Sequence, residues 1–245
     1  MELLNYFISG FIIGGLGTCI GGILSVLIHN PSDKVVSCLL SFAAGIMLSI
    51  ISFDLLPNAY EIGGFFIVSL GLSIGLVMVF CAEEMLPTKR LKKYTGKNLT
   101  YIKMGLIIMI SLGLHNFPEG VAVGSSYAYS NDMGIKIGIL IAAHNIPEGM
   151  SVGVPMKMAG ASSLTIILLT LLTGLPTAIG AVIGSILGGI SNYFISFCLA
   201  AAASSMLYVT ASELLPEARV LHKGKISSVF LTVGFICGIY LTLAV

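Results

Sequence analysis

Long apolar runs alternate with short polar segments along the whole chain. Eight runs are long enough to cross a hydrocarbon core of about 30 Å. They cover roughly 3–28, 35–57, 62–86, 101–129, 134–156, 163–188, 192–216 and 226–244. Gly and Pro interrupt several runs, which membrane helices tolerate when neighbouring helices or water satisfy the freed backbone groups. The pattern predicts an all-α polytopic membrane protein in which residues 1–245 form a single domain with eight transmembrane helices.

The composition excludes a soluble globule. Hydrophobic residues make up 56% of the chain, charged residues only 9%, and the mean hydropathy is +1.02, so too few charges are present to cover a water-exposed surface. The N-terminal MELLNYFISG has an acidic residue where a signal peptide has a basic one, which favours a retained first helix. The five cysteines are scattered without CxxC spacing, so neither a disulfide framework nor a thiolate metal site is expected. We expect a multi-pass protein of the cell membrane.

The basic residues predict the orientation. Of the 12 Lys and Arg, only Lys136 falls in an even-numbered loop or a tail, whereas the others lie in odd-numbered loops. By the positive-inside rule the odd loops are cytoplasmic and both termini are extracellular. The most basic loop, PTKRLKKYTGKNLTYIK, could suggest nucleic acid or anionic lipid, but a solvated cytoplasmic loop explains it without a partner. No nucleic-acid partner is predicted.

Two sequence repeats relate distant helices. LHNFPEG at 114–120 recurs as AHNIPEG at 143–149, in the fourth and fifth helices, and SFDLLPNA at 52–59 in the second helix matches ASELLPEA at 211–218 in the seventh. Met47 and Met206 fall in register with the second match. Each pair runs in opposite directions through the membrane, which predicts an inverted repeat of helices 1–3 and 6–8 around central helices 4 and 5. Such repeats are common in transporters, with the substrate site near the midplane.

The first motif carries a compact set of polar groups. On a helix, His115 and Glu119 share one face and Asn116 is displaced by about 100°. Pro118 has no N–H, so the carbonyl of residue 114 loses its helical partner, and Gly120 lets another helix approach closely. The second copy offers the Ala143 carbonyl, His144, Asn145, Glu148 and Gly149 in the same arrangement.

Facing copies would bring two imidazoles, two carboxylates and two amide oxygens together. This donor set suits Zn²⁺ and could also hold Fe²⁺, Mn²⁺, Co²⁺ or Cd²⁺. A lone membrane histidine often only bonds to a neighbouring helix. A carboxylate at mid-membrane, however, costs roughly 2.5–3.5 kcal/mol, and both copies carry one. The predicted metal residues are His115, Asn116, Glu119, His144, Asn145 and Glu148.

The chain has HNFPEG in its fourth predicted span, HNIPEG in its fifth, eight spans in all and outward termini. In these features it resembles the ZIP metal-ion transporters, especially their short bacterial zinc-uptake and GufA-type branches. The resemblance covers essentially the whole chain and implies a binuclear site between helices four and five. It implies that His115, Glu119, His144 and Glu148 are ligands of a first metal, and that the Asn116 and Asn145 side chains join the two bridging glutamates at a second.

One position departs from the family pattern. Bacterial members often supply a further glutamate from helix six to the second metal, where this chain has Thr177 within TGLPTAIGA. Two divalent ions bring four positive charges and the two glutamates return only two negative ones, so the second ion is expected to bind weakly or not at all. The hypothesis is one tightly held metal per chain.

Other membrane carboxylates suggest a route. Asp54 is predicted near the outer end of helix two as an entrance, and Glu83, Glu84, Glu213 and Glu217 near the inner ends of helices three and seven as an exit. Each could instead lie at headgroup level. Met47 and Met206 could line the route, although Met more often fills core gaps. No His-rich loop lies between helices three and four, so metal capture there is not supported.

These features predict a carrier that imports Zn²⁺ into the cytoplasm by alternating exposure of the midplane site. The metal is its substrate, the lipid bilayer its surroundings, no organic cofactor is expected, and a homodimer is left open. The alternatives are a membrane-embedded zinc hydrolase, which would require an HExxH motif that neither HNFPE nor HNIPE supplies, and a metal-sensing receptor without transport.

Overall fold

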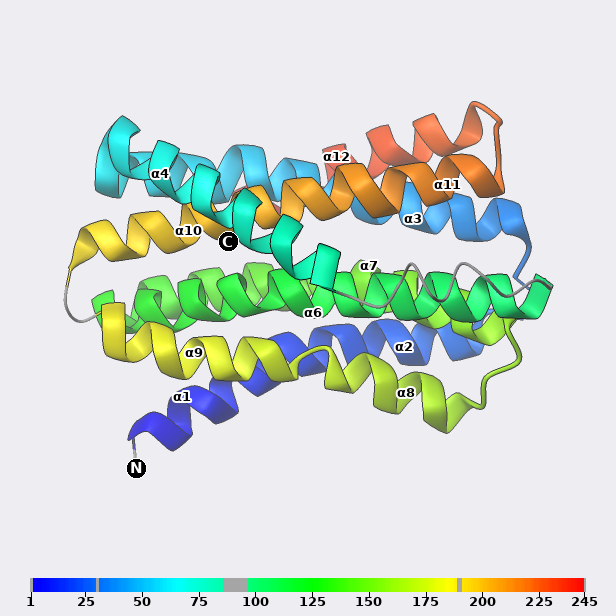
Figure 1. The fold of residues 1–245 in the computed structure, drawn as a ribbon, viewed down its shortest axis with the longest axis horizontal. Coiled ribbons are helices and arrows are strands. Elements are labelled where there is room, and N and C mark those ends of the chain that lie inside the picture. Colours follow the sequence, from blue (N-terminus) through cyan, green and yellow to red (C-terminus); the bar gives the residue numbers. More distant parts are fainter. Residues whose placement is uncertain (1, 30, 86–96, 189–190, 245) are drawn as a thin grey trace.

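The computed structural model describes residues 2–29, 31–85, 97–188 and 191–244, and these residues form helices joined by short connections. Seven helical stretches in this part of the chain are long and apolar enough to cross a membrane. The protein is therefore an all-helical, polytopic membrane protein, as the apolar runs predict. Figure 1 shows the helices lying roughly along one common direction, as a bundle.

Residues 2–158 contribute four helical stretches. Helices α1 (Glu2–Phe11) and α2 (Gly17–Leu27) are joined by a π-helical segment, η1 (Ile12–Leu16). Helix α3 (Asp33–Ile50) continues through a second π segment, η2 (Ile51–Leu55), into α4 (Leu56–Met85). The two central helices follow, and they are α6 (Lys97–Tyr129) and α7 (Asn131–Met158).

The rest of the chain also contains interrupted helices. Helices α8 (Ser163–Leu172) and α9 (Leu175–Gly188) are separated by a short turn, and α10 (Asn192–Val209) leads through the π segment η3 (Thr210–Leu214) into α11 (Leu215–Leu221). Helix α12 (Ile226–Ala244) ends the described chain. The predicted span 163–188 is thus two helices, because Thr173 and Gly174 form a turn and Pro176 follows at the start of α9, where a missing N–H is tolerated.

The predicted loop between residues 57 and 62 is helical, and the chain changes direction at Gly64 instead. Helical structure continues past 57, and the chain departs from helical geometry only at Gly64, with φ +69° and ψ −178°. Glycine adopts this left-handed φ without a Cβ clash, so one residue suffices for the change of direction visible at the start of α4 (Figure 1). The stretch Asp33–Cys81 therefore contains a sharp turn rather than one straight helix.

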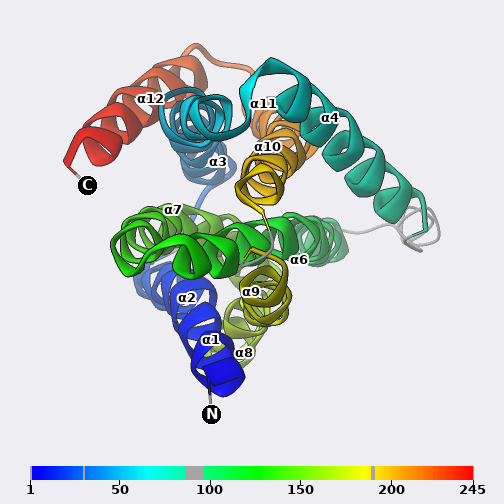
Figure 2. The ribbon, with the colours of Figure 1, turned by 90° about the vertical axis from the view of Figure 1, so that its left-hand side faces the viewer.

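Helices α6 and α7 form the centre of the molecule. Figure 2 shows them between two groups, with α1, α2, α8 and α9 on one side and α3, α4, α10, α11 and α12 on the other. Helix α6 packs mainly on α9 and α7 mainly on α2, whereas α3 packs on α12 and α10 on α4. The central pair therefore has more extensive contact with the first group than with the second.

The parts of the chain before and after the central helices α6 and α7 are here called the two halves. Equivalent residues of the two halves differ by 159 in number and make equivalent contacts. The π segments η2 (51–55) and η3 (210–214) occupy equivalent positions. Gly75 lies against the Ala201 carbonyl, and its equivalent Gly234 lies against the carbonyl of Phe42, the equivalent of Ala201. Helix packing thus recurs between the two halves with each partner exchanged.

Three connections gather at one end of the bundle. The segments between α2 and α3, between α7 and α8, and between α11 and α12 all lie at the right-hand end of Figure 1. Lys157 at this end donates hydrogen bonds from Nζ to the carbonyl oxygens of Val26 and Ile28, the latter at 2.5 Å. This cation satisfies carbonyls at the C-terminus of α2, where a positive charge also complements the helix dipole.

Candidate metal site

Four side chains from the two motifs meet between α6 and α7. His115 Nε2 lies 3.3 Å from Glu148 Oε1, and His144 Nε2 lies 3.3 Å from Glu119 Oε1. Within each helix the same imidazole nitrogens lie 3.8 and 3.7 Å from the carboxylate four residues later. Each imidazole thus faces both carboxylates, one from its own helix and one from the other helix.

The cluster is shielded from solvent and lipid. The four residues are at most 1% exposed, and ligand atoms of His115, Glu119 and Glu148 lie within 4.8 Å of one another. The second carboxylate oxygens, Glu119 Oε2 and Glu148 Oε2, are buried without hydrogen-bond partners. Because an isolated buried carboxylate is strongly unfavourable, this set calls for a compensating positive charge.

The His144 ring has a defined tautomer in this arrangement. Its Nδ1 lies 3.1 Å from the carbonyl oxygen of Leu140, one turn earlier on α7. Since a carbonyl oxygen can only accept, Nδ1 carries the proton, and in the neutral ring the lone pair is on Nε2. That lone pair faces a carboxylate oxygen, so a metal ion or a proton must lie between them to make the contact favourable.

The two asparagines are held by the interrupted helices. Asn116 donates from Nδ2 to the Thr173 carbonyl at 2.8 Å, at the turn between α8 and α9, and Asn145 donates to the Gly14 carbonyl in η1 at 3.3 Å. Both Oδ1 atoms are buried without a hydrogen-bond partner. The amide oxygens are therefore presented as free acceptors, which is the orientation that a cation site needs.

The glycines that end the motifs allow this close packing. A Cβ placed on Gly120 would overlap the Thr177 backbone carbonyl, and one on Gly149 would overlap the Thr18 carbonyl. The predicted role of Gly120 in close helix approach is confirmed. Helices α6 and α7 continue through Pro118 and Pro147, so the interruptions in this structure lie in the flanking helices.

Thr177 lies in the same buried region. It is fully buried, its hydroxyl has no hydrogen-bond partner, and its side chain fills the space next to Gly14. Its equivalent in the other half, Thr18, instead donates its hydroxyl to the Gly14 carbonyl at 2.9 Å. The position thus supplies a neutral oxygen where the family pattern suggests a carboxylate.

The residues predicted to line a route are distributed differently. Asp54 lies in η2, is 2% exposed, and accepts a hydrogen bond from Asn58 at 2.9 Å while its Oδ2 has no partner. Met47 and Met206 are packed in the buried apolar core, where the Thr210 hydroxyl lies 3.6 Å from Met47 Sδ.

The acidic exit residues are less defined. Glu213 and Glu217 are half-buried and have interactions of their own. The side chains of Glu83 and Glu84 lie outside the described part of the structure.

Sequence reasoning missed the backbone carbonyls of Gly14, Leu140 and Thr173, which position the predicted side chains. The only local signals for Gly14 and Thr173 are the glycine-rich run IIGGLG and the TGLP turn. Neither signal identifies the partner side chain, because these two contacts join segments far apart in the chain, whereas Leu140 lies one helical turn before His144.

Comparison with known proteins extends these observations. The sequence pattern of the family described as ZIP zinc transporter matches residues 88–245, which is more than half of the chain. The chain belongs to the ZIP family. It is a membrane transport protein, not an enzyme, and a multi-pass protein of the inner membrane.

Individual ZIP proteins are similar over almost the whole length. The zinc transporter ZupT of Enterobacter sp. (strain 638) is 33% identical over 236 residues, covering 93% of this chain and 90% of that protein. The ZupT proteins of Shigella flexneri and of Escherichia coli (strain K12 / DH10B) are 32% identical with the same coverage. The similarity therefore includes both halves and the central helices.

Proposed function

We propose that this ZIP protein imports Zn²⁺ into the cytoplasm through the buried cluster of His115, Glu119, His144 and Glu148. The observation that carries the proposal is the reciprocal geometry, in which each imidazole nitrogen faces a carboxylate of the other helix at 3.3 Å. Imidazole and carboxylate form a borderline donor set that suits Zn²⁺. The similar ZupT proteins are named as zinc transporters, which supports the choice of ion.

The six predicted ligands divide into two groups by chemistry. The four His and Glu side chains would hold the transported ion. Asn116 and Asn145, with their buried unpaired Oδ1 atoms, would contact an ion displaced toward the flanking helices, shared with the second oxygens of the two glutamates. Thr177 adds no charge there, which supports one tightly bound ion and one weakly bound or absent ion.

Eight spans with both termini extracellular form part of this proposal. The turn at Gly64 supports dividing Asp33–Cys81 into two spans, which would complete eight. The helix ends and connections that contain Lys34, Lys157, Lys223 and Lys225 lie at one end of the bundle, and by the positive-inside rule we assign that end to the cytoplasm.

The packing supports an inverted repeat within one transporter domain of residues 1–245. The exchanged contacts of the two halves, such as Gly75 with Ala201 and Gly234 with Phe42, are those expected of two units related by an axis in the membrane plane. Because α6 and α7 pack mainly on α1, α2, α8 and α9, these helices would move together against α3, α4, α10 and α12. This motion would expose the site alternately to each side.

Uptake by the purified protein in liposomes tests the proposal. Zinc-loaded buffer outside and a fluorescent zinc indicator inside should report uptake by the unaltered protein, and His115→Ala with Glu119→Ala should remove it. Substituting Lys34→Gln, away from the cluster, is the control for handling and insertion. Normal transport by the double variant would contradict the site. Binding without uptake would favour a metal-sensing receptor.

Ion selectivity is measured in the same vesicles. Fe²⁺, Mn²⁺, Cd²⁺ and Co²⁺ are further candidate substrates because the donor set accepts them. Each is added in competition with Zn²⁺, and an ion that shares the pathway should reduce zinc uptake in a concentration-dependent way. An ion that leaves zinc uptake unchanged at large excess is not a substrate.

A further inference from the structure

A polar cavity lies at the end of the bundle that carries the basic connections, and none of the residues of the candidate metal site lines it. It has a volume of about 370 Å³ and lies between α3, α11 and the start of α12. Four of its ten lining residues are basic or imidazole side chains, and they are Arg219, His222, Lys223 and Lys225. None of the ten is acidic, so the cavity favours an anion.

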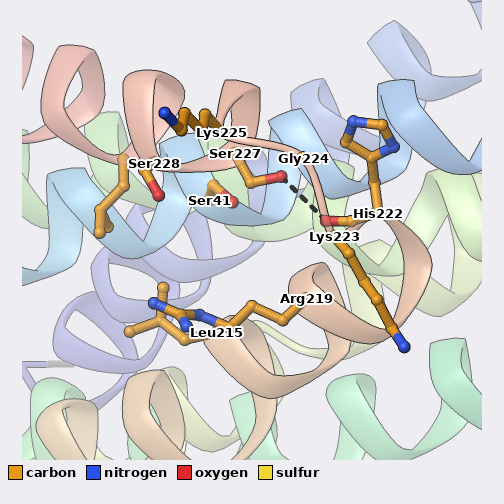
Figure 3. Close-up of a pocket in the computed structure, with 10 residues that line it drawn as sticks. Ser41, Leu215, Arg219, His222, Lys223, Gly224, Lys225, Ser227 and Ser228 are labelled. Carbon is orange, nitrogen blue, oxygen red and sulfur yellow. Dashed lines mark hydrogen bonds between the residues drawn. The ribbon is translucent and has the colours of Figure 1, made fainter.

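Ser41 contributes a nearly buried hydroxyl to the cavity wall. It lines the cavity although the residue is only 2% exposed. The hydroxyl of the neighbouring Ser227 pairs with Ser37 Oγ at 2.6 Å and with the His222 carbonyl at 3.5 Å. Figure 3 shows Ser41 beside Ser227 and Ser228, with the Arg219 side chain below them.

The walls combine three kinds of donor around one volume. Arg219 offers a planar guanidinium suited to bidentate contact with phosphate oxygens, and Lys223 and Lys225 lie at opposite rims on flexible stems (Figure 3). The first turn of α12 carries Ser227 and Ser228, and the N-terminus of this 19-residue helix adds a positive partial charge. A tetrahedral anion with several acceptor oxygens matches this set better than a planar carboxylate.

We propose that this cavity binds a phosphate group, supplied by the headgroup of an anionic phospholipid or by free phosphate. The lipid source is favoured by the surroundings. Leu215 and Leu231 form an apolar wall, and the nearby Val220 and Val229 are 74% and 52% exposed, which suits acyl chains beside the headgroup. By the basic connections, this end faces the cytoplasmic leaflet, where anionic lipids attract Lys and Arg.

Lipid retention tests the first source. The protein is purified in mild detergent, mixed with equal amounts of phosphatidylglycerol and phosphatidylcholine, and its bound lipid is measured by native mass spectrometry. We expect preferential retention of phosphatidylglycerol, reduced about fivefold by Arg219→Gln, the loss of one surface cation, and about tenfold by Ser41→Ala, the loss of a hydrogen bond to a charged group. Lys34→Gln, at the same end but outside the cavity, should retain lipid as the unaltered protein does.

Ser41→Ala, which changes no charge, distinguishes lipid binding inside the cavity from general attraction to the basic surface. If Arg219→Gln and Lys34→Gln reduce retention equally while Ser41→Ala has no effect, the lipid is held by general surface charge and the proposal is wrong. The Arg219 and Ser41 side chains are not part of the His–Glu cluster between α6 and α7. Circular dichroism and size-exclusion profiles equal to those of the unaltered protein confirm that each variant is folded.

Inorganic phosphate tests the second source. Delipidated protein is heated with increasing sodium phosphate, with sodium chloride at matched ionic strength as the reference. If phosphate raises the melting temperature of the unaltered protein but not of Ser41→Ala, while phosphatidylglycerol is not retained, free phosphate is the ligand. If neither phosphate nor phosphatidylglycerol discriminates between these two proteins, the cavity is not a phosphate site.

Discussion

The two copies of the polar motif, HNFPEG on α6 and HNIPEG on α7, have nearly equal surroundings. In each, the imidazole lies 3.3 Å from the glutamate of the other copy, the asparagine donates to a carbonyl of an interrupted helix, and the final glycine contacts the backbone of a threonine. The same three side-chain types, His, Asn and Glu, thus occupy both sides of one cluster. A duplicated motif is sufficient to supply the side chains of the candidate metal site.

The copies differ in what holds these atoms in place. His144 Nδ1 donates to the Leu140 carbonyl, whereas His115 Nδ1 is buried without a hydrogen-bond partner. The threonine hydroxyls differ in the same way, since Thr18 donates to Gly14 and Thr177 has no partner. The symmetry therefore extends to the His, Asn and Glu side chains and to the carbonyls that hold the asparagines, but not to the hydrogen bonds of the imidazole Nδ1 atoms and the threonine hydroxyls. The α7 imidazole therefore has one more hydrogen bond than the α6 imidazole.

The largest expected effect comes from breaking the packing that both copies share. Gly120→Ala and Gly149→Ala each place a methyl group against a backbone carbonyl that cannot rotate away. Each should lower the free energy of unfolding by about 1–3 kcal/mol, measured by thermal unfolding in detergent. Gly113→Ala on α6 is the matched control, because its Cβ would meet only Pro176 Cγ at 3.8 Å. A Gly120→Ala protein as stable as the control would contradict the packing.

The second-largest expected effect is a difference in zinc affinity between the two histidine variants. His144 is held in its ligand orientation by Leu140, so it loses less freedom on binding the ion. His144→Ala should therefore weaken zinc affinity about tenfold more than His115→Ala. Competition with a chromophoric zinc chelator measures both affinities under the same conditions. Equal losses would show that the Leu140 hydrogen bond has no role in binding.

The smallest effect concerns the number of ions. Elemental analysis after dialysis should find one tightly bound zinc per chain in the unaltered protein, because Thr177 supplies no charge. Thr177→Glu should add a second ion, since a third carboxylate offsets more of the four positive charges. The neutral Thr177→Gln has a similar size and should still bind one. Two equally tight ions in the unaltered protein would contradict the hypothesis.

Local sequence was sufficient for much of the helical framework. The bounds of α7, 131–158, lie within three residues of the predicted 134–156, and α12 begins at the predicted residue 226. A bilayer imposes a strong local requirement, because each spanning segment must be apolar and must satisfy its own backbone hydrogen bonds. The paired HNxPEG motifs were also visible without a structure, since a costly polar group repeated in an apolar run stands out.

The fine structure of the helices was not predictable from periodicity. A π segment and an α-helix have nearly the same apolar pattern, so η1, η2 and η3 leave little local signal. The turn at Gly64 likewise depends on one residue with φ +69°, and many glycines in this chain remain helical.

The sequence by itself determined the class of protein, the apolar spans and the chemical types at the metal cluster, because these follow from composition and from a repeated motif. Only the tertiary structure decided that the Gly14 and Thr173 carbonyls hold the asparagines and that Ser41 and Arg219 share one cavity. These contacts join residues distant in the chain. Their geometry therefore arises only when the helices pack together.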